Sequence, residues 1–317
     1  MDDFQLNLGG CRVRVKTNGG RQLLHRYIEP DDTQDSAEPF RTIIAVVGKM
    51  DDNVERSWSA GQIYRSDWAL KGYYSGHYFG DPVLLRRVGT TYIVSGPNLA
   101  VFLWRYLIKL ILADFARERA VLHFKCACVS QEGRGCLIFG LSKAGKTTLV
   151  QALVAAGADF VSNTHTFVNP ATMQAIAVRS KIRVRGRGYE KDGPESPAGA
   201  ADLMHEAGAI FPQANIREGA KIESMFFLQR VPDAPSTPLL LPPDQCALIL
   251  HNLFISTQFY DIQHDIIEDN RMSLIEYSDY IAESEASIRK VADSSRSYYL
   301  PVSRITDELA REVLKLI

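Results

Sequence analysis

The sequence predicts an α/β protein in two domains, a smaller β-rich N-terminal domain over residues 1–118 and a second domain over residues 119–317. Three observations predict this organisation. Short runs rich in β-branched residues, separated by Gly, Asp and Asn, fill the first part of the chain. A long apolar run at helical spacing follows. Beyond it, strand-like runs alternate with amphipathic helix-like segments, as they do in α/β domains.

Four strand-like runs predict the N-terminal domain: Cys11–Val15, Arg41–Val47, Pro82–Val88 and Thr90–Ser95. A helix over Gly96–Ala120 is predicted to follow them and to lead into the second domain.

The most apolar stretch of the chain, Leu99–Phe115, lies in that helix, with Asn98 as the expected N-cap. Arg105 and Lys109 interrupt it, so it falls short of the roughly 18 uncharged residues of a membrane span. We expect a buried core helix. The acidic N-terminus lacks the basic and apolar regions of a secretory signal, and a cytoplasmic location is expected.

The composition argues against several classes of protein. Of the 317 residues, 46% are hydrophobic and 23% are charged, which is typical of a globular protein. A formal net charge of −1 provides no overall basic field for nucleic acid or an anionic membrane. The cysteines contain no second close pair that would complete a zinc site, so buried reduced thiols are expected. They are Cys11, Cys126, Cys128, Cys136 and Cys246.

The second domain is predicted to open with strands at Ala120–Ser130 and Gly135–Gly140, a helix at Thr147–Ala158 that Gly157 ends, and a strand over Asp159–Val168. The later segments are two strands, a proline-rich loop and two helices. In that order they are Ala175–Gly186, Ile222–Val231, Asp233–Gln245, Gln245–Phe259 and Ile305–Ile317.

The stretch Gly140–Thr147 fits the phosphate-binding pattern G-x-x-x-x-G-K-[ST]. Its glycines allow backbone N–H groups to turn toward phosphates, and the following helix adds positive charge at its N-terminus. Lys146 is expected to reach the β- and γ-phosphates of ATP, and the Thr147 hydroxyl to bind Mg²⁺. The expected nucleotide-binding residues are Gly140, Ser142, Lys143, Ala144, Gly145, Lys146, Thr147 and Thr148.

A second acidic motif, an apolar strand that ends in Asp, is missing. The nearest candidates are Ile43–Asp51, which lies far upstream, and Met225–Arg230 and Leu248–His251, which end in other residues. The N-K-x-D motif of GTPases is also absent. These absences argue against the common ATPase and GTPase designs.

The segment Arg119–Pro170 resembles the phosphotransferase domain of the HPr kinase/phosphorylase family. The shared pattern is a strand with a histidine, here His123, a turn, a second strand, the phosphate loop with its helix, and a further strand. Ile182–Gly188 is similar to the family's Arg-Gly-x-Gly signature. The resemblance implies a sheet of the HPr kinase/phosphoenolpyruvate carboxykinase type and phosphoryl transfer to a hydroxyl. Family members commonly assemble, so a homo-oligomer is implied too.

The chain departs from the family where that family has two aspartates and this sequence has Asn163 and Thr164. Arg183 replaces a further acidic residue. An amide can help to hold a Mg²⁺-bound water, but it cannot take a proton. Three alternatives stay open: another group is the base, transfer relies on positioning alone, or catalysis has been lost.

Replacement bases are few. His165 follows Asn163 by two residues, on the same side of the expected strand, and is either a general base or a packed histidine. His123 is either catalytic or bonded to a neighbouring loop. Glu190 and Asp192 either bind metal or belong to a solvated loop.

A basic face is predicted on the strand after residue 178. At alternate positions the bases either grip an anion or form a solvated face. They are Arg179, Lys181, Arg183, Arg185 and Arg187. Five more bases are possible partners of the site: Arg217, Lys221, Arg289, Arg296 and Arg304.

The predicted function is an ATP- and Mg²⁺-dependent kinase that phosphorylates a hydroxyl of a small molecule or peptide. The alternatives are a catalytically silent nucleotide-binding regulator and a nucleotidyl transferase. The expected catalytic residues are Lys146, Asn163, His165, His123 and Arg185.

Overall fold

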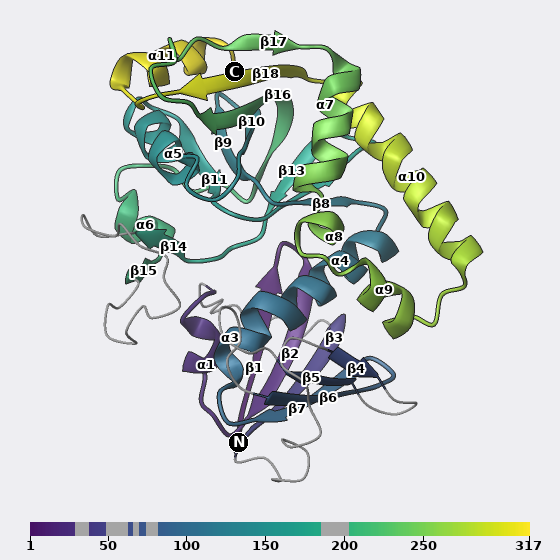
Figure 1. Cartoon of the computed structure of the whole chain (residues 1–317). Helices are drawn as coiled ribbons and strands as arrows, with labels where there is room; N and C mark the ends of the chain where they lie inside the picture. Colours follow the sequence, from purple (N-terminus) through teal and green to yellow (C-terminus); the bar gives the residue numbers. More distant parts are fainter. Residues whose placement is uncertain (29–37, 49–62, 66–69, 74–81, 185–202) are drawn as a thin grey trace. The chain divides into compact units, whose positions relative to one another are not determined.

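The computed structural model divides the chain into two compact units (Figure 1). Unit 1 comprises residues 1–112 and 183–205, and unit 2 comprises residues 113–182 and 206–317. Among the described residues, every helix is too short or too polar to cross a bilayer. The structure describes residues 1–28, 38–48, 63–65, 70–73, 82–184 and 203–317.

Unit 1 is built on one sheet with the strand order β1-β2-β3-β7-β6-β5-β4. The four strands expected from the sequence are all present, as β2, β3, β6 and β7. Buried and less buried residues alternate along β2 and β3, so one face of the sheet carries a core. The elements are β1 (Asp2–Leu8), β2 (Cys11–Thr17), α1 (Gln22–His25), β3 (Arg41–Val47), β4 (Ile63–Arg65), β5 (Leu70–Tyr73), β6 (Pro82–Val88) and β7 (Thr91–Gly96). A separate pair consists of β14 (Ile182–Val184) and β15 (Leu203–His205).

The predicted core helix is confirmed, with one π-helical turn in its middle. It runs through α3 (Leu99–Phe102), η1 (Leu103–Leu107) and α4 (Ile108–Glu118). Asn98 occupies the N-cap position but its side chain makes no capping hydrogen bond. Lys109 is only 3% exposed, and its ammonium lies 3.1 Å from the centre of the Trp104 ring, a cation–π contact.

Unit 2 contains a mixed sheet with the strand order β11-β9-β10-β16-β13-β12-β8. β18 joins it beside β16, and β17 pairs with β18. Figure 1 shows α5 and α11 on one side of this sheet, and α7 and α10 on the other. The strands are β8 (Leu122–Phe124), β9 (Ala127–Gln131), β10 (Arg134–Phe139), β11 (Asp159–Ser162), β12 (Thr166–Asn169), β13 (Gln174–Ala177), β16 (Gly219–Arg230), β17 (Leu239–Leu241) and β18 (Arg296–Val302). The helices are α5 (Lys146–Ala155), α6 (Ala207–Ile210), α7 (Pro243–Ile249), η2 (Leu250–Phe254), α8 (Ser256–Phe259), α9 (Gln263–Asp269), α10 (Leu274–Asp293) and α11 (Asp307–Lys315).

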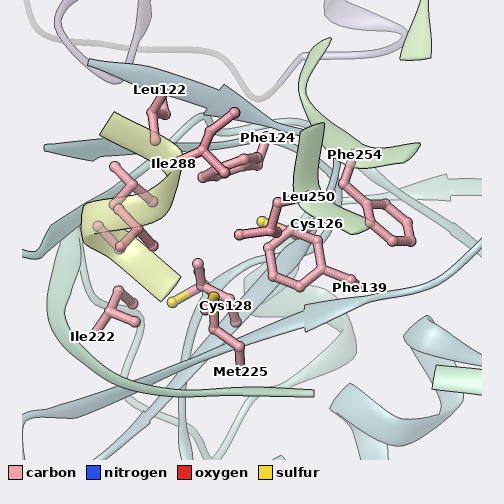
Figure 2. Close-up of a cluster of buried hydrophobic side chains, with 14 of the residues drawn as sticks. Leu122, Phe124, Cys126, Cys128, Phe139, Ile222, Met225, Leu250, Phe254 and Ile288 are labelled. Carbon is pink, nitrogen blue, oxygen red and sulfur yellow. The ribbon is translucent and has the colours of Figure 1, made fainter. Parts of the chain in front are cut away.

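An apolar core lies between the sheet and the helices α7, η2 and α10 (Figure 2). Phe139, the last residue of β10, is fully buried there. Its ring centre lies 5.1 Å from those of Phe227 and Phe254, and 5.6 Å from that of Phe124. Burying a phenylalanine side chain stabilises a fold by about 1.5–3 kcal/mol. The aromatic packing therefore fixes the end of β10, from which the glycine loop begins.

Two long strands expected from the sequence are each broken in the middle, at the same level. The predicted strand Ala120–Ser130 forms two shorter strands, β8 and β9, and the predicted strand Asp159–Val168 forms β11 and β12. The halves keep one antiparallel register, since Phe124 pairs with Thr166 and Cys128 with Ser162. At the break, the Lys125 N–H donates to the Phe254 carbonyl oxygen at 2.9 Å. The expectation that Asn163 and His165 share one face of an extended strand is therefore wrong.

Two further expectations are wrong for reasons of tertiary structure. The strand predicted over Ala175–Gly186 stops at Ala177 and resumes only at Ile182. The loop predicted over Asp233–Gln245 contains β17, because Leu239–Leu241 pairs with β18, and the start of α7, where Pro243 occupies the first turn. The predicted helix Gln245–Phe259 is present, but Ile255 interrupts it with an extended backbone and pairs with Phe124.

α10 and β18 have no counterpart in the sequence analysis. A signal for α10 was available, because Ser273 and Glu276 have the spacing of a capping box. In the structure both bonds of the box are formed: the Glu276 N–H donates to Ser273 Oγ at 3.2 Å and the Ser273 N–H to Glu276 Oε2 at 2.7 Å.

Candidate functional site

The glycine loop lies between the strand and helix that the sequence predicted, β10 and α5. Gly145 is the N-cap of α5 and has a left-handed backbone with φ +99°. A Cβ at Gly145 would lie 2.9 Å from Ile305 Cδ1, and one at Gly140 would lie 2.8 Å from the Leu228 carbonyl oxygen. Glycine is therefore required at position 140 by the close approach of the Leu228 backbone, and at position 145 by the left-handed backbone conformation, since the end of the Ile305 side chain can shift.

The side chains of the loop differ in exposure. Ser142, Lys143 and Thr148 are exposed, and Ala144 is buried beneath the loop. Lys146 and Thr147 are half-buried in the first turn of α5. The Lys146 ammonium donates to the carbonyl oxygens of Gly140 and Leu141, the second at 3.1 Å. The ammonium thus folds back over the loop, where its charge faces the region that the loop encloses.

Four parallel strands end at the same edge of the sheet as the loop. β16 is parallel to β10, and β18 is parallel to β16. β11 is antiparallel to β9, which is antiparallel to β10, so β11 also runs parallel to β10. Neighbouring strands are about 4.8 Å apart, so β11 lies about 10 Å from β10. Asn163, which directly follows β11, is therefore at the edge that carries the glycine loop.

The bend after β11 leaves one polar atom without a partner. Ser162 and Thr166 close the bend through a hydroxyl–hydroxyl bond of 2.6 Å. Asn163 is 8% exposed, and its amide nitrogen donates to Thr164 Oγ1 at 3.3 Å. Asn163 Oδ1 is buried and has no hydrogen-bond partner in the described part of the chain. Because buried polar atoms are normally satisfied, this oxygen is available to a ligand.

Cys126 provides a second link between the bend and the loop. Cys126 lies in the break between β8 and β9, and its thiol makes a hydrogen bond with Thr166, which closes the bend. Burial raises the pKa of its thiol from 9.0 to about 12. A hydrogen bond with Thr166 and the charges of Lys146 and Lys125 act in the lowering direction. Cys126 therefore hydrogen-bonds with a residue of the bend and feels the charge of Lys146 in the loop.

The two candidate histidines lie in one buried chain of hydrogen bonds. His123 is 1% exposed and His165 is fully buried. His123 Nε2 and His165 Nδ1 are 3.2 Å apart, and His165 Nε2 is 3.3 Å from the hydroxyl of Tyr260. Each imidazole bond needs one donor and one acceptor, so the tautomers of the two rings are coupled. Burial raises the pKa of Tyr260 well above its ordinary value, and the phenol stays protonated.

The predicted basic face is not formed as expected. Arg179 and Lys181 lie between β13 and β14 and not on a strand. Arg179 pairs with Glu218, and Lys181 Nζ lies 3.4 Å from Glu206 Oε1. Both charges are thus already partnered. Arg185 and Arg187, like Glu190 and Asp192, lie outside the described residues.

Two bases lie at the edge of the sheet that carries the glycine loop: Arg304, one of the five possible partners named from the sequence, and Arg230, which was not among them. Arg230 ends β16 and Arg304 follows β18, and both are exposed. Arg304 directly precedes Ile305, whose side chain packs against Gly145. In the sequence, each of these bases is marked only by its position at the end of an apolar run. That position becomes informative once β10, β16 and β18 are known to be parallel, because their ends then lie at one edge.

The candidate metal ligands near the loop are oxygens of neutral side chains. Within the described ranges, no group of three or more His, Cys, Asp or Glu side chains is placed to hold a metal ion. The Thr147 hydroxyl and the unpartnered Asn163 Oδ1 are two oxygens that this edge offers. Mg²⁺ commonly takes one or two oxygens from the protein, together with phosphate oxygens and waters. These two residues fit that requirement.

Comparison with solved structures gives 47 matching chains. The solved structure of the Hpr(Ser) kinase/phosphatase from Coxiella burnetii matches 52% of this chain and 97% of its own, at 13% sequence identity and a TM-score of 0.25. At that TM-score the likeness decides nothing about the fold or activity of this chain. No family model matches the sequence, and no curated protein matches it.

Proposed function

We propose that residues 119–317 form a phosphotransferase domain and that the protein is an ATP- and Mg²⁺-dependent kinase. Its acceptor is a hydroxyl group of a small molecule or a peptide. The observation that carries this proposal is the glycine loop between β10 and α5, with Lys146 folded over it. The unpartnered amide oxygen of Asn163 at the same edge of the sheet supports it.

Binding of the triphosphate follows from the loop. Backbone N–H groups around Gly145 and the N-terminus of α5 are suited to phosphate oxygens. The ammonium of Lys146 exchanges its two backbone carbonyl partners for the β- and γ-phosphates, to which it adds a full positive charge. Thr147 and Asn163 would hold Mg²⁺ through their side-chain oxygens. When bound, the ion supplies charge neutralisation on the transferred group.

The transfer breaks the bond between the γ-phosphorus and the bridging oxygen of ADP, and it forms a bond to the acceptor oxygen. The acceptor proton leaves to water or to a base. A loose transition state demands little from that base, so Asn163 can act by orienting the hydroxyl or a bound water. Arg304, Arg230 and, from outside the described residues, Arg185 are the candidates for neutralising charge on the equatorial oxygens.

The role of the histidines follows from their burial. His165 bonds through both ring nitrogens to protein groups, so service as a general base requires one of those bonds to open. We propose that His165 and His123 chiefly hold the bend that positions Asn163. A general-base role for His165 predicts a loss of transfer of about 10²–10⁴-fold in His165→Ala. A positioning role predicts a loss below about tenfold.

The experiment is incubation of the full chain with ATP, Mg²⁺ and a panel of hydroxyl compounds, with analysis of both products. The proposal expects ADP and a phosphorylated acceptor in equal amounts. AMP or pyrophosphate would contradict it and show a nucleotidyl transferase. Saturable nucleotide binding without transfer to any acceptor would instead favour the catalytically silent regulator, for which the Asn163–Thr164 pair is the structural argument.

A further inference from the structure

Unit 2 has a small cavity away from the glycine loop, between α4, β8, α8 and α10. Its volume is about 70 Å³. No residue of the segment 140–148 lines it. Small alanine side chains of α4, among them Ala113 and Ala116, make room on one side, and His123 of β8 contributes an imidazole.

The walls of the cavity are rich in hydroxyl groups. Tyr280, Ser284 and Ser287 come from α10 at the spacing i, i+4, i+7, which places them on one face of that helix. Ser256 and Thr257 come from the first turn of α8 and are 1% and 5% exposed. A hydroxyl group both donates and accepts, so these walls match a ligand whose own groups do the same.

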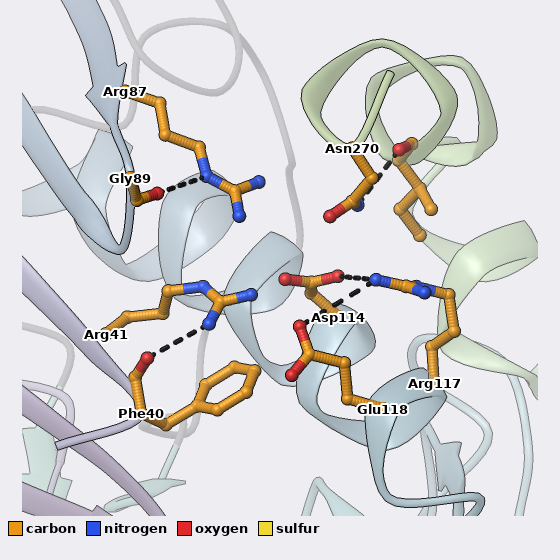
Figure 3. A network of polar contacts seen from close by, with 9 residues as sticks. Phe40, Arg41, Arg87, Gly89, Asp114, Arg117, Glu118 and Asn270 are labelled. Atoms are coloured by element: carbon orange, nitrogen blue, oxygen red, sulfur yellow. Dashed lines mark hydrogen bonds and ion pairs between the residues drawn. The ribbon is translucent and has the colours of Figure 1, made fainter. Parts of the chain in front are cut away.

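The positive charge that Arg117 brings to the cavity is balanced by two neighbouring carboxylates, which do not line the cavity themselves. Arg117 lines it, and Arg117 Nη2 lies 2.8 Å from Asp114 Oδ1 and 3.8 Å from Glu118 Oε1 (Figure 3). Asp114 is buried, so this pair is shielded from water. Arg117 Nε is buried and has no hydrogen-bond partner within the described residues. Arg117 therefore brings one unsatisfied N–H donor to the wall of the cavity, and its positive charge is offset by the two carboxylates.

Glu283 adds a negative group to the same cavity. It is exposed and lines the cavity from α10. An anionic ligand would meet the Glu283 carboxylate and a guanidinium that two carboxylates already neutralise. Like charges in one site disfavour binding, so phosphorylated ligands are expected to bind less tightly than neutral ones.

We propose that this cavity binds a small neutral polyol. The inference goes beyond the proposed kinase function, since it depends on no residue of the glycine loop. The polyol hydroxyls bond to the serine, threonine and tyrosine hydroxyls, and one ligand oxygen accepts from Arg117 Nε–H.

The test measures equilibrium binding of sorbitol and of sorbitol 6-phosphate to the full chain without nucleotide. Ligand-observed NMR monitors the binding. Saturation is the readout, because polyols at high concentration stabilise proteins without a specific site. We expect saturable binding of sorbitol, with the phosphate ester at least about tenfold weaker. A response to sorbitol that rises without saturating would overturn the proposal, as would tighter binding of the phosphate ester.

Matched variants locate the binding. Ser287→Leu fills the cavity and is expected to weaken sorbitol binding at least about tenfold. Thr257→Val removes a hydroxyl at nearly constant volume and is expected to weaken sorbitol binding about three- to tenfold. It replaces the leucine variant if that variant does not fold. Ser278→Leu, on the opposite exposed face of α10, should bind like the wild type. Equal binding by the wild type and the cavity variants would contradict the assignment of the site.

Discussion

The glycine loop Gly140–Thr147 and the bend Asn163–His165 end two parallel strands of the same sheet, yet they are built in different ways. The loop follows from a local pattern, because the spacing of its glycines and Lys146 predicts a strand–loop–helix unit from the sequence. The bend depends on distant segments. Phe254 accepts a hydrogen bond at the opposite strand break, the Val178 N–H donates to the His165 carbonyl oxygen, and Tyr260 bonds the His165 ring.

The difference separates binding from chemistry. A locally determined loop can hold phosphate whatever surrounds it, whereas the group that meets the acceptor depends on how the rest of the unit folds. We therefore expect variants in the loop to remove activity while the fold is kept, and variants in the bend to affect activity and stability together.

The largest effect is expected for Lys146→Ala. It removes the charge that faces the phosphates, so transfer should fall at least about 10²–10³-fold. The unfolding midpoint in urea should stay near that of the wild type, because Lys146 is only half-buried. Lys290→Ala, an exposed lysine of α10, is the control. Activity of the Lys146 variant within about tenfold of the control would break the comparison.

The next effect concerns Asn163. Asn163→Ala removes the unpartnered oxygen, and kcat/KM at limiting Mg²⁺ should fall about 10- to 100-fold. Asn163→Asp places a carboxylate there, and the Mg²⁺ concentration needed for half-maximal rate should decrease. If both variants show the Mg²⁺ dependence of the wild type, Asn163 is not at the metal.

His165→Ala is expected to have a smaller effect on transfer, below about tenfold, and a clear effect on stability. Loss of bonds to His123 and Tyr260 should lower the free energy of unfolding by about 1–3 kcal/mol, measured in urea. His264→Ala, at an exposed position, is the control and should change neither quantity. A larger loss of transfer at unchanged stability would make His165 a base and not a positioning residue.

At neutral pH the buried thiols should have no effect, and they become visible only in alkali. Burial raises the pKa of Cys126 and Cys136 from 9.0 to about 12. The folded state keeps these protons while the unfolded state releases them above about pH 9, so stability falls between pH 9 and pH 12. Urea unfolding at about pH 8 and about pH 10 measures this fall, and Cys136→Ala should reduce it. An equal fall in both proteins would assign it to other groups.

Most of the secondary structure followed from local patterns, and the errors lie where distant segments decide. Four of the seven strands in the sheet of unit 1, the core helix and the glycine loop were predicted from periodicity and turn residues. The strand breaks were not predicted. Nothing in Ala120–Ser130 or Asp159–Val168 shows that Phe254 and Val178 will form backbone hydrogen bonds at the breaks. The same holds for β17, which is a strand only because β18 lies beside it.

The site was predicted to a similar extent. Lys146 and Thr147 follow from a spacing, and Asn163 from the resemblance of the segment to a known family. The bond between His123 and His165 required the pairing of β8 with β12, which no local pattern encodes. Arg304 could be assigned to the site only once the structure showed that Ile305 packs on Gly145. Groups that act from the ends of different strands need the sheet order before they can be assigned.

The central claim is that the glycine loop binds a nucleoside triphosphate with Mg²⁺. Calorimetric titration of Mg·ATP into the wild type and into Lys146→Ala tests it most directly. The account predicts one saturable site per chain in the wild type and binding at least about 100-fold weaker in the variant. Equal binding by both proteins, or no binding by the wild type, would contradict it.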